Sequence, residues 1–276
     1  MQTLPDGFLH CHPKLIDGSK IMTLHQLQEP VPYAVARWSS WVEPIQHKDD
    51  LLGNHFSEIN ERLAEVRAEI KYRAICTPST IVSMLLPIDE ELESWRRSLP
   101  PSWQYKSIQS SHPGTETYGS HFDIYSNIWI ASTWNNYRSV RFMIYEHIMS
   151  TVLKYGREEE DKAILRTATT VLREMTDGVC SSVPYHFGRW KDSHTGTKMS
   201  NDGSIPGGYL IIWPLYLSGM LHTTPTAQKH WIAAQLKQIA IRMGLRLAYS
   251  MSEQLLKIDK SFSDSSVWFI GEWYPR

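Results

Sequence analysis

The amino-acid sequence predicts an all-α protein, with a single helical domain preceded by a loop-rich N-terminal arm. After residue 50, apolar residues recur every three or four positions, which is the spacing of one face of an α-helix. The alternation of apolar and polar residues that is typical of half-buried strands persists nowhere. Aromatic residues make up 11% of the 276 residues, including 11 tryptophans, so we expect a heavily aromatic interior.

Composition excludes several classes of protein. Lys and Arg total 28 and Asp and Glu total 29, so no excess of positive charge attracts nucleic acid or an anionic membrane. The three cysteines, Cys11, Cys76 and Cys180, are too few and too scattered for a disulfide framework or a four-cysteine zinc site. No signal peptide and no apolar stretch of about 20 residues is visible. We therefore expect an intracellular protein, nuclear or cytoplasmic, with no membrane contact.

The first half of the chain predicts the arm and three helices. Residues 1–50 carry five prolines and form the arm, and residues 51–276 form the all-α domain. The pair Thr77-Pro78 is typical of a helix start, and a short helix is expected over residues 88–98. Residues 102–119 read as a loop. The first helix of the domain is indicated by a stripe of four residues: Ile59, Leu63, Val66 and Ile70.

A long aromatic helix is expected over residues 122–155. The acidic run 158–161 precedes a helix that ends near Cys180, because negative charge is favourable at a helix N-terminus. Residues 191–206 are polar and rich in Gly, Ser and Thr, so we expect a mobile loop. A buried helix over 208–221 follows, and Thr224-Pro225 opens a last long helix. Its inward side chains are expected to be Trp231, Leu236, Ile239, Met243, Leu247 and Met251.

Sequence motifs for phosphate binding, for a serine nucleophile and for a metalloprotease are absent. The segment His10-Cys11-His12 lacks two further zinc ligands at a familiar spacing, so we expect no metal and no cofactor. Cys180 and His186 would make a nucleophile–base pair if the chain folded back between them. Six residues apart across Val183-Pro184, they are more typical of a helix end and a buried histidine.

Aromatic residues with polar tips predict a ligand-binding cavity. It would lie between the segment 134–138, a turn at 184–187 and the helix around 209–216. Its eight expected lining residues are Trp134, Asn135, Tyr137, Arg138, His186, Tyr209, Trp213 and Tyr216. The plainer alternatives are that Asn135 is a buried amide bonded to backbone and that His186 ties down the turn. Arg138 and Arg141 need partners if they are buried.

Several segments resemble the regulatory domain of fungal-specific transcription factors. Residues 89–95 (DEELESW) followed by 99–105 (LPPSWQY) resemble an acid-rich helix and its following segment in that family. Further similar segments come in the expected order: Trp129 with 134–139 (WNNYRS), 177–188 (DGVCSSVPYHFG), 207–216 (GGYLIIWPLY) and 242–244 (RMG). The resemblance spans roughly residues 80–256.

The resemblance implies an all-α regulatory or effector module. In that family the module normally follows a zinc-cluster DNA-binding head with six cysteines, whereas this chain has three scattered ones. It also lacks an N-terminal run of Lys and Arg, so we expect no direct, sequence-specific DNA binding. The implied function is a regulator that binds a small apolar metabolite, a partner regulator or a second copy of itself.

The alternative is an enzyme. A standalone copy of such a domain, recruited to fungal natural-product biosynthesis, would use the aromatic pocket for cyclisation, dehydration or isomerisation of an apolar intermediate. His186, Tyr137 and Tyr209 would then be the catalytic residues, with His186 the acid–base group. The family supplies no established catalytic residues, and a truncated transcription factor is a third possibility that the sequence leaves open.

Overall fold

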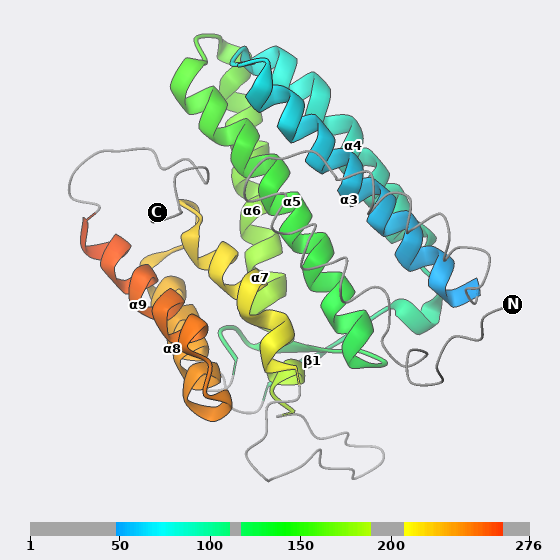
Figure 1. Cartoon of the computed structure of the whole chain (residues 1–276), viewed down its shortest axis with the longest axis vertical. Helices are drawn as coiled ribbons and strands as arrows, with labels where there is room; N and C mark the ends of the chain where they lie inside the picture. The colour runs from blue at the N-terminus through cyan, green and yellow to red at the C-terminus, as the bar shows by residue number, and fades with distance from the viewer. Residues whose placement is uncertain (1–47, 111–116, 189–206, 262–276) are drawn as a thin grey trace, which may run out of the picture. The chain divides into compact units, whose positions relative to one another are not determined.

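The computed structural model describes residues 48–110, 117–188 and 207–261. The predicted arm, except for its last three residues, and the loop predicted over 191–206 lie outside them. The described chain is helical apart from one small two-stranded sheet, which confirms the predicted all-α class (Figure 1). It divides into two compact units whose described parts are residues 48–97 and 98–261.

The first unit is a pair of helices, α3 (Lys48–Tyr72) and α4 (Pro78–Ser98). Trp95 joins them: it is 1% exposed, and its indole N–H donates to the carbonyl of Leu52 at 2.8 Å. The ring of Phe56 lies 5.0 Å from the Trp95 ring. Helix α4 begins at Pro78, as the N-cap signal predicts, but it continues through Pro87, so the prediction of a short helix over 88–98 is wrong at its N-terminal end.

Two long helices of 28 residues each, α5 (Ile128–Tyr155) and α6 (Glu159–His186), run side by side in the second unit. Helix α7 (Gly208–Met220) contacts both of them, and α8 (Thr226–Met243) and α9 (Arg246–Ser261) pack on α7 (Figure 1). Gly219 permits this packing, because a Cβ atom there would lie 2.7 Å from a methyl group of Leu255 on α9.

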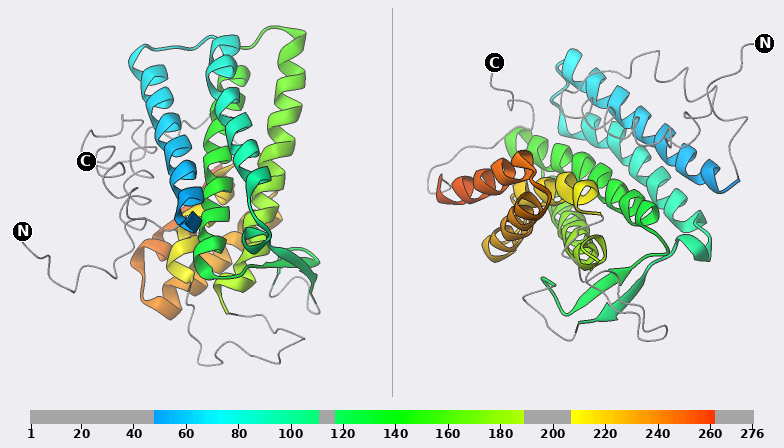
Figure 2. Two further views of the ribbon diagram at one scale, coloured as in Figure 1. Left: turned by 90° about the vertical axis from the view of Figure 1, so that its right-hand side faces the viewer. Right: turned by 60° about the horizontal axis from the view of Figure 1, so that its bottom comes forward.

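A small sheet stands where the sequence predicts a loop and the start of a helix. Strands β1 (Lys106–Gln109) and β2 (His121–Ile124) pair antiparallel, and β2 lies against α6 (Figure 2). A 3-10 turn, η2 (Pro101–Trp103), precedes them. Helix α5 begins only at Ile128 because Asn127 caps it, its side-chain oxygen accepting from the backbone N–H of Ile130 at 2.9 Å.

Helix α6 is longer than predicted. Its acidic start is confirmed, since the backbone N–H of Glu158 donates to a carboxylate oxygen of Asp161 at 2.8 Å. At the other end it continues past Cys180 to His186, with Pro184 inside its last turns. The predicted turn at 184–187 is therefore the end of a helix, because Pro184 removes only one backbone N–H from the helical ladder.

The predicted last helix is in fact two helices, α8 and α9. Gly244 ends α8 with a φ of +69°, a left-handed conformation that favours glycine. Because α8 and α9 are separate helices, the three- and four-residue spacing of buried side chains in α8 does not continue into α9. Leu236, Ile239 and Met251 are buried as predicted and Trp231 is half-buried. Met243 and Leu247 were expected inward and are instead 38% and 58% exposed.

Candidate functional site

Three of the predicted site residues meet in a buried polar network between α5 and α6. Asn135 and Arg138 lie one turn apart on α5, and His186 lies at the end of α6. The amide nitrogen of Asn135 donates to the hydroxyl of Ser182 at 2.9 Å and lies 3.0 Å from Nε2 of His186. The amide oxygen of Asn135 accepts from Arg138 at 2.8 Å. Asn135 thus joins the imidazole to the guanidinium.

His186 is held in one neutral tautomer. Its Nδ1 lies 3.2 Å from the carbonyl oxygen of Gly207, which can only accept, so Nδ1 carries the hydrogen. Nε2 is then free to accept from the Asn135 amide. Burial lowers the pKa of His186 to about 4, and the charge of Arg138 acts in the same direction. At neutral pH the ring is an uncharged link between α6 and the residue before α7.

Arg138 is the charged centre of the network. It is 3% exposed, and it donates to the hydroxyl of Tyr125 at 3.0 Å. Its other terminal nitrogen lies 3.4 Å from a carboxylate oxygen of Asp123, whose side chain is 5% exposed. The hydroxyl of Ser107 donates to the second carboxylate oxygen at 2.6 Å. The small sheet therefore supplies the counterion for a guanidinium buried on α5.

Burial and charge oppose each other within this ion pair. Burial raises the pKa of Asp123, while Arg138 and the hydrogen bonds from Ser107 and Tyr125 oppose the rise. Burial alone would lower the pKa of Arg138, but Tyr125, Tyr105 and Asp123 more than offset it, so its pKa is raised. Burial also raises the pKa of Tyr125. Arg138 stays charged and Tyr125 stays neutral over the physiological range.

Aromatic rings and a glycine enclose the guanidinium. Its central carbon lies 5.4 Å from the ring centre of Tyr105 and 5.8 Å from that of Trp134, within cation–π range. The indole N–H of Trp134 donates to the carbonyl of Trp103 at 2.8 Å. Gly178 on α6 leaves the space, because a Cβ atom there would lie 2.6 Å from Nε of Arg138.

The other predicted site residues form no hydrogen bond to Asn135, Arg138 or His186. The hydroxyl of Tyr137 accepts from Arg141 at 3.1 Å, so both arginines that needed partners have them. Tyr209 is 61% exposed and joins no hydrogen bond of the network. Trp213 is half-buried, with its ring 5.9 Å from that of Tyr216. The hydroxyl of Tyr216 donates to Gln254 on α9 at 3.0 Å, and burial raises its pKa to about 12.

The structure places no reactive pair at Cys180 and His186. The Cys180 thiol accepts from the side-chain amide of Gln228 at 3.5 Å, and burial raises its pKa to about 12.

In the described part of the chain, no three His, Cys, Asp or Glu side chains gather as metal ligands would. The segment His10-Cys11-His12 lies outside the described residues. None of the described helices combines the length and apolar character needed to cross a membrane.

Sequence reasoning missed four members of the network: Ser107, Asp123, Tyr125 and Ser182. The available signal was the requirement that a buried arginine have hydrogen-bond or ion-pair partners. This requirement does not identify which residues of the sequence the partners are. Asp123 and Tyr125 fall where a helix was expected. Their true positions, on β2 and directly after it, are what bring them to α5.

Comparison of the chain with protein-family models, with curated proteins and with solved structures gives no match.

Proposed function

We propose that the chain is a regulatory module, similar to those of fungal transcription factors, which acts by binding a partner regulator or a small apolar metabolite. The ordered segments that resemble that family support the fold and this role. We favour binding over catalysis because of one observation: the polar groups of the buried network already form hydrogen bonds within the protein. Asn135, Arg138 and His186 each use their polar atoms on other groups of the protein.

Three features argue against the enzyme alternative. His186, its proposed acid–base group, is fully buried, and a pKa of about 4 leaves it without a proton to give at neutral pH. Its Nε2 is occupied by Asn135 rather than facing a substrate. The other two catalytic candidates lie elsewhere, Tyr137 bonded to Arg141 and Tyr209 exposed on α7.

The proposal predicts an effect on transcription. With the full chain fused to a heterologous DNA-binding domain in yeast, we expect reporter expression to change several-fold relative to the DNA-binding domain alone. The comparison is a fusion carrying Asp123→Ala, which removes the counterion of Arg138 and so destabilises the fold. We expect this fusion to lose the effect while immunoblotting shows how much of it accumulates.

Two outcomes would contradict the proposal. One is unchanged reporter expression in both rich and minimal medium at normal fusion abundance, since a regulatory module must alter output under some condition. The other is selective enrichment of one DNA sequence by the purified chain alone at about 150 mM salt. A near-neutral chain has little counterion release to supply such binding, and direct DNA binding would replace partner binding as its mode of action.

A further inference from the structure

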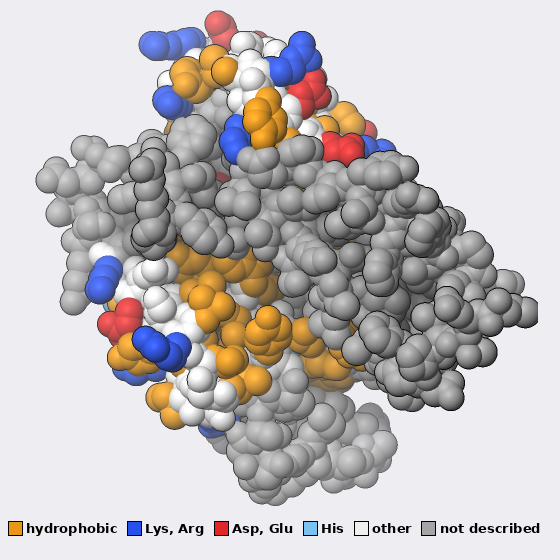
Figure 3. Space-filling view, in the orientation of Figure 1, with side chains coloured by type: hydrophobic (Ala, Val, Ile, Leu, Met, Phe, Trp, Pro, Cys, Tyr) orange, Lys and Arg blue, Asp and Glu red, His pale blue; other side chains and the backbone are white. Residues whose placement is uncertain are grey.

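The hairpin of α8 and α9 exposes large apolar side chains away from the buried network. Ile241 is 71% exposed, Leu247 58%, Tyr249 47% and Met243 38%. The space-filling view shows apolar and basic side chains interspersed with an acidic one and with white atoms over α8 and α9 (Figure 3). Single exposed apolar residues are normal on a protein surface, but four large ones within nine positions of the chain are typical of an interaction site.

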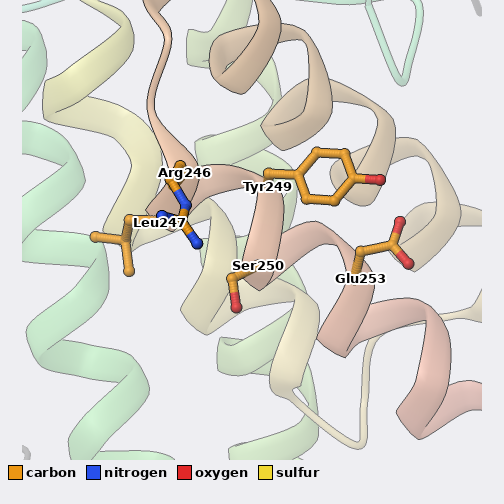
Figure 4. A pocket seen from close by; sticks show the side chains of 5 residues that line it. All are labelled: Arg246, Leu247, Tyr249, Ser250 and Glu253. Carbon is orange, nitrogen blue, oxygen red and sulfur yellow. The ribbon is translucent and has the colours of Figure 1, made fainter.

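A hollow of about 500 Å³ runs along α9 beside these residues. Leu247 and Tyr249 project to opposite sides of the helix, with the small Ser250 between them (Figure 4). Arg246 and Glu253 complete the lining. The hollow thus has a small floor flanked by two apolar side chains, a shape that accepts an apolar anchor from another molecule.

Basic residues lie on both sides of the turn between α8 and α9, with Arg242 before it and Arg246 after it. The sequences of the two helices contain six Lys and Arg residues and two acidic residues, of which Lys229 is buried and Glu253 lines the hollow. Helix α8 contains no acidic residue. Within the described part of the chain Arg242 and Arg246 form no ion pair, and Lys237 lies 5.8 Å over the ring of Tyr249. Two guanidinium groups therefore face solvent beside exposed apolar side chains.

We propose that this surface, Ile241, Met243, Leu247 and Tyr249 with Arg242 and Arg246, binds an acidic amphipathic helix of a partner protein. The inference rests on the proposed regulatory function and names the chemistry of the partner. An amphipathic helix presents apolar anchors at positions i, i+3 or i+4 and i+7, and these match a surface with an apolar centre. Carboxylates beside the anchors would meet Arg242 and Arg246, which speeds association and fixes orientation.

The same charge pattern disfavours two other occupants. A second copy of this chain would bring the basic hairpin against itself, and like charges facing each other are unfavourable. The phosphates of a nucleic acid would contact the basic side chains favourably. Ile241 and Leu247 would then face phosphate and sugar, so their apolar area would stay in contact with polar groups.

The test uses the full chain and synthetic 18-residue peptides labelled with fluorescein. The first peptide carries Leu and Phe on one helical face and Glu on the other. The second has Lys in place of Glu, and the third has the first composition in scrambled order. Anisotropy titrations should give saturable binding of the Glu peptide alone. Leu247→Ala and the double change Arg242→Glu with Arg246→Glu should each weaken binding about tenfold.

A matched control exists on α5. Leu153 is 58% exposed, the same fraction as Leu247, and Leu153→Ala should leave peptide binding unchanged. Circular dichroism confirms that each variant keeps its helical content. Equal binding of the Lys peptide, or equal loss with Leu153→Ala and Leu247→Ala, overturns the inference. So does tighter binding of a 30-base single strand of DNA that displaces the peptide, or a dimer that Leu247→Ala dissociates.

The reporter assay separates failure of this inference from failure of the proposed function. If the reporter responds while no peptide binds, the regulatory function stands and the assignment of this surface fails. If the Glu peptide binds but the reporter is silent, the surface is a docking site and the regulatory function fails.

Discussion

Acidification should destabilise this protein through His186. The pKa of His186 in the folded protein is about 4, against 6.5 for an unperturbed histidine, because burial opposes the charged ring. Between these two pH values the unfolded state binds more protons than the folded state. The stabilising contribution is therefore complete above pH 6.5 and is lost as the pH falls toward 4.

The magnitude follows from the difference between the two pKa values. A difference of about 2.5 units corresponds to about 3 kcal/mol of unfolding free energy, of which about 2 kcal/mol is lost by pH 4.5. Burial and the charge of Arg138 keep the pKa low, because they outweigh hydrogen bonds from the ring to the backbone of Gly207 and of Ala131, which favour the protonated form.

Urea-induced unfolding at pH 7.5, 6.5, 5.5 and 4.5 measures the loss. His186→Asn keeps a donor near the Gly207 carbonyl but has no titrating group, so its unfolding free energy should fall less between pH 7.5 and 4.5. The wild-type loss should exceed the variant's by about 2 kcal/mol. His55→Asn, which replaces a histidine whose side chain is 53% exposed, should keep the wild-type loss. Identical losses in wild type and His186→Asn would refute the assignment of a buried neutral imidazole.

Two further predictions concern the neighbours of Arg138. Asp123→Ala should lower the unfolding free energy by about 3–5 kcal/mol, because it leaves a buried guanidinium without its counterion, and adding Arg138→Met should recover part of the loss in the same urea assay; a double variant no more stable than the single one would contradict the pairing. Gly178→Ala should cost about 1–3 kcal/mol despite the better helix propensity of alanine, because its Cβ would meet Arg138. Gly119→Ala, where nothing lies within 4 Å of the added carbon, should change stability by less than about 0.5 kcal/mol, and equal costs at the two glycines would exclude the proposed clash.

Most of the helices could be predicted from periodicity and from Gly and Pro signals. The apolar stripe of Ile59 and Leu63 is buried in α3, and Pro78 begins α4 as its N-cap signal indicates. The ends of the helices were harder to predict. A proline usually marks a helix end, but Pro87 and Pro184 lie inside helices that tertiary contacts stabilise. Strands of four residues offer too few positions for an alternating pattern to be recognised.

The sequence predicted that some residues of the candidate site lie together, and their role in binding a ligand stays a prediction. Asn135, Arg138 and His186 were expected together and do meet. Tyr209, Trp213 and Tyr216 share one face of α7 by their spacing, and that face turns to solvent and to Gln254 on α9 rather than to the network. Which face of a helix points at a given neighbour depends on packing that no local pattern encodes. The counterion of Arg138 is Asp123, which lies on β2, a strand that the sequence did not predict.

Three of the segments on which the expected resemblance to fungal regulatory domains depends contribute residues to the buried network. Asn135 and Arg138 come from the segment 134–139, Gly178 and His186 from the segment 177–188, and Gly207 opens the segment 207–216. Gly178 and Gly207 are glycines because a Cβ atom would meet Arg138 at one position and His186 at the other. These three segments thus meet in one buried network. Buried residues of this kind stabilise a fold, and a fold alone does not determine which partner a protein binds. We therefore expect the residues that select a partner on the exposed hairpin of α8 and α9 rather than in the buried network.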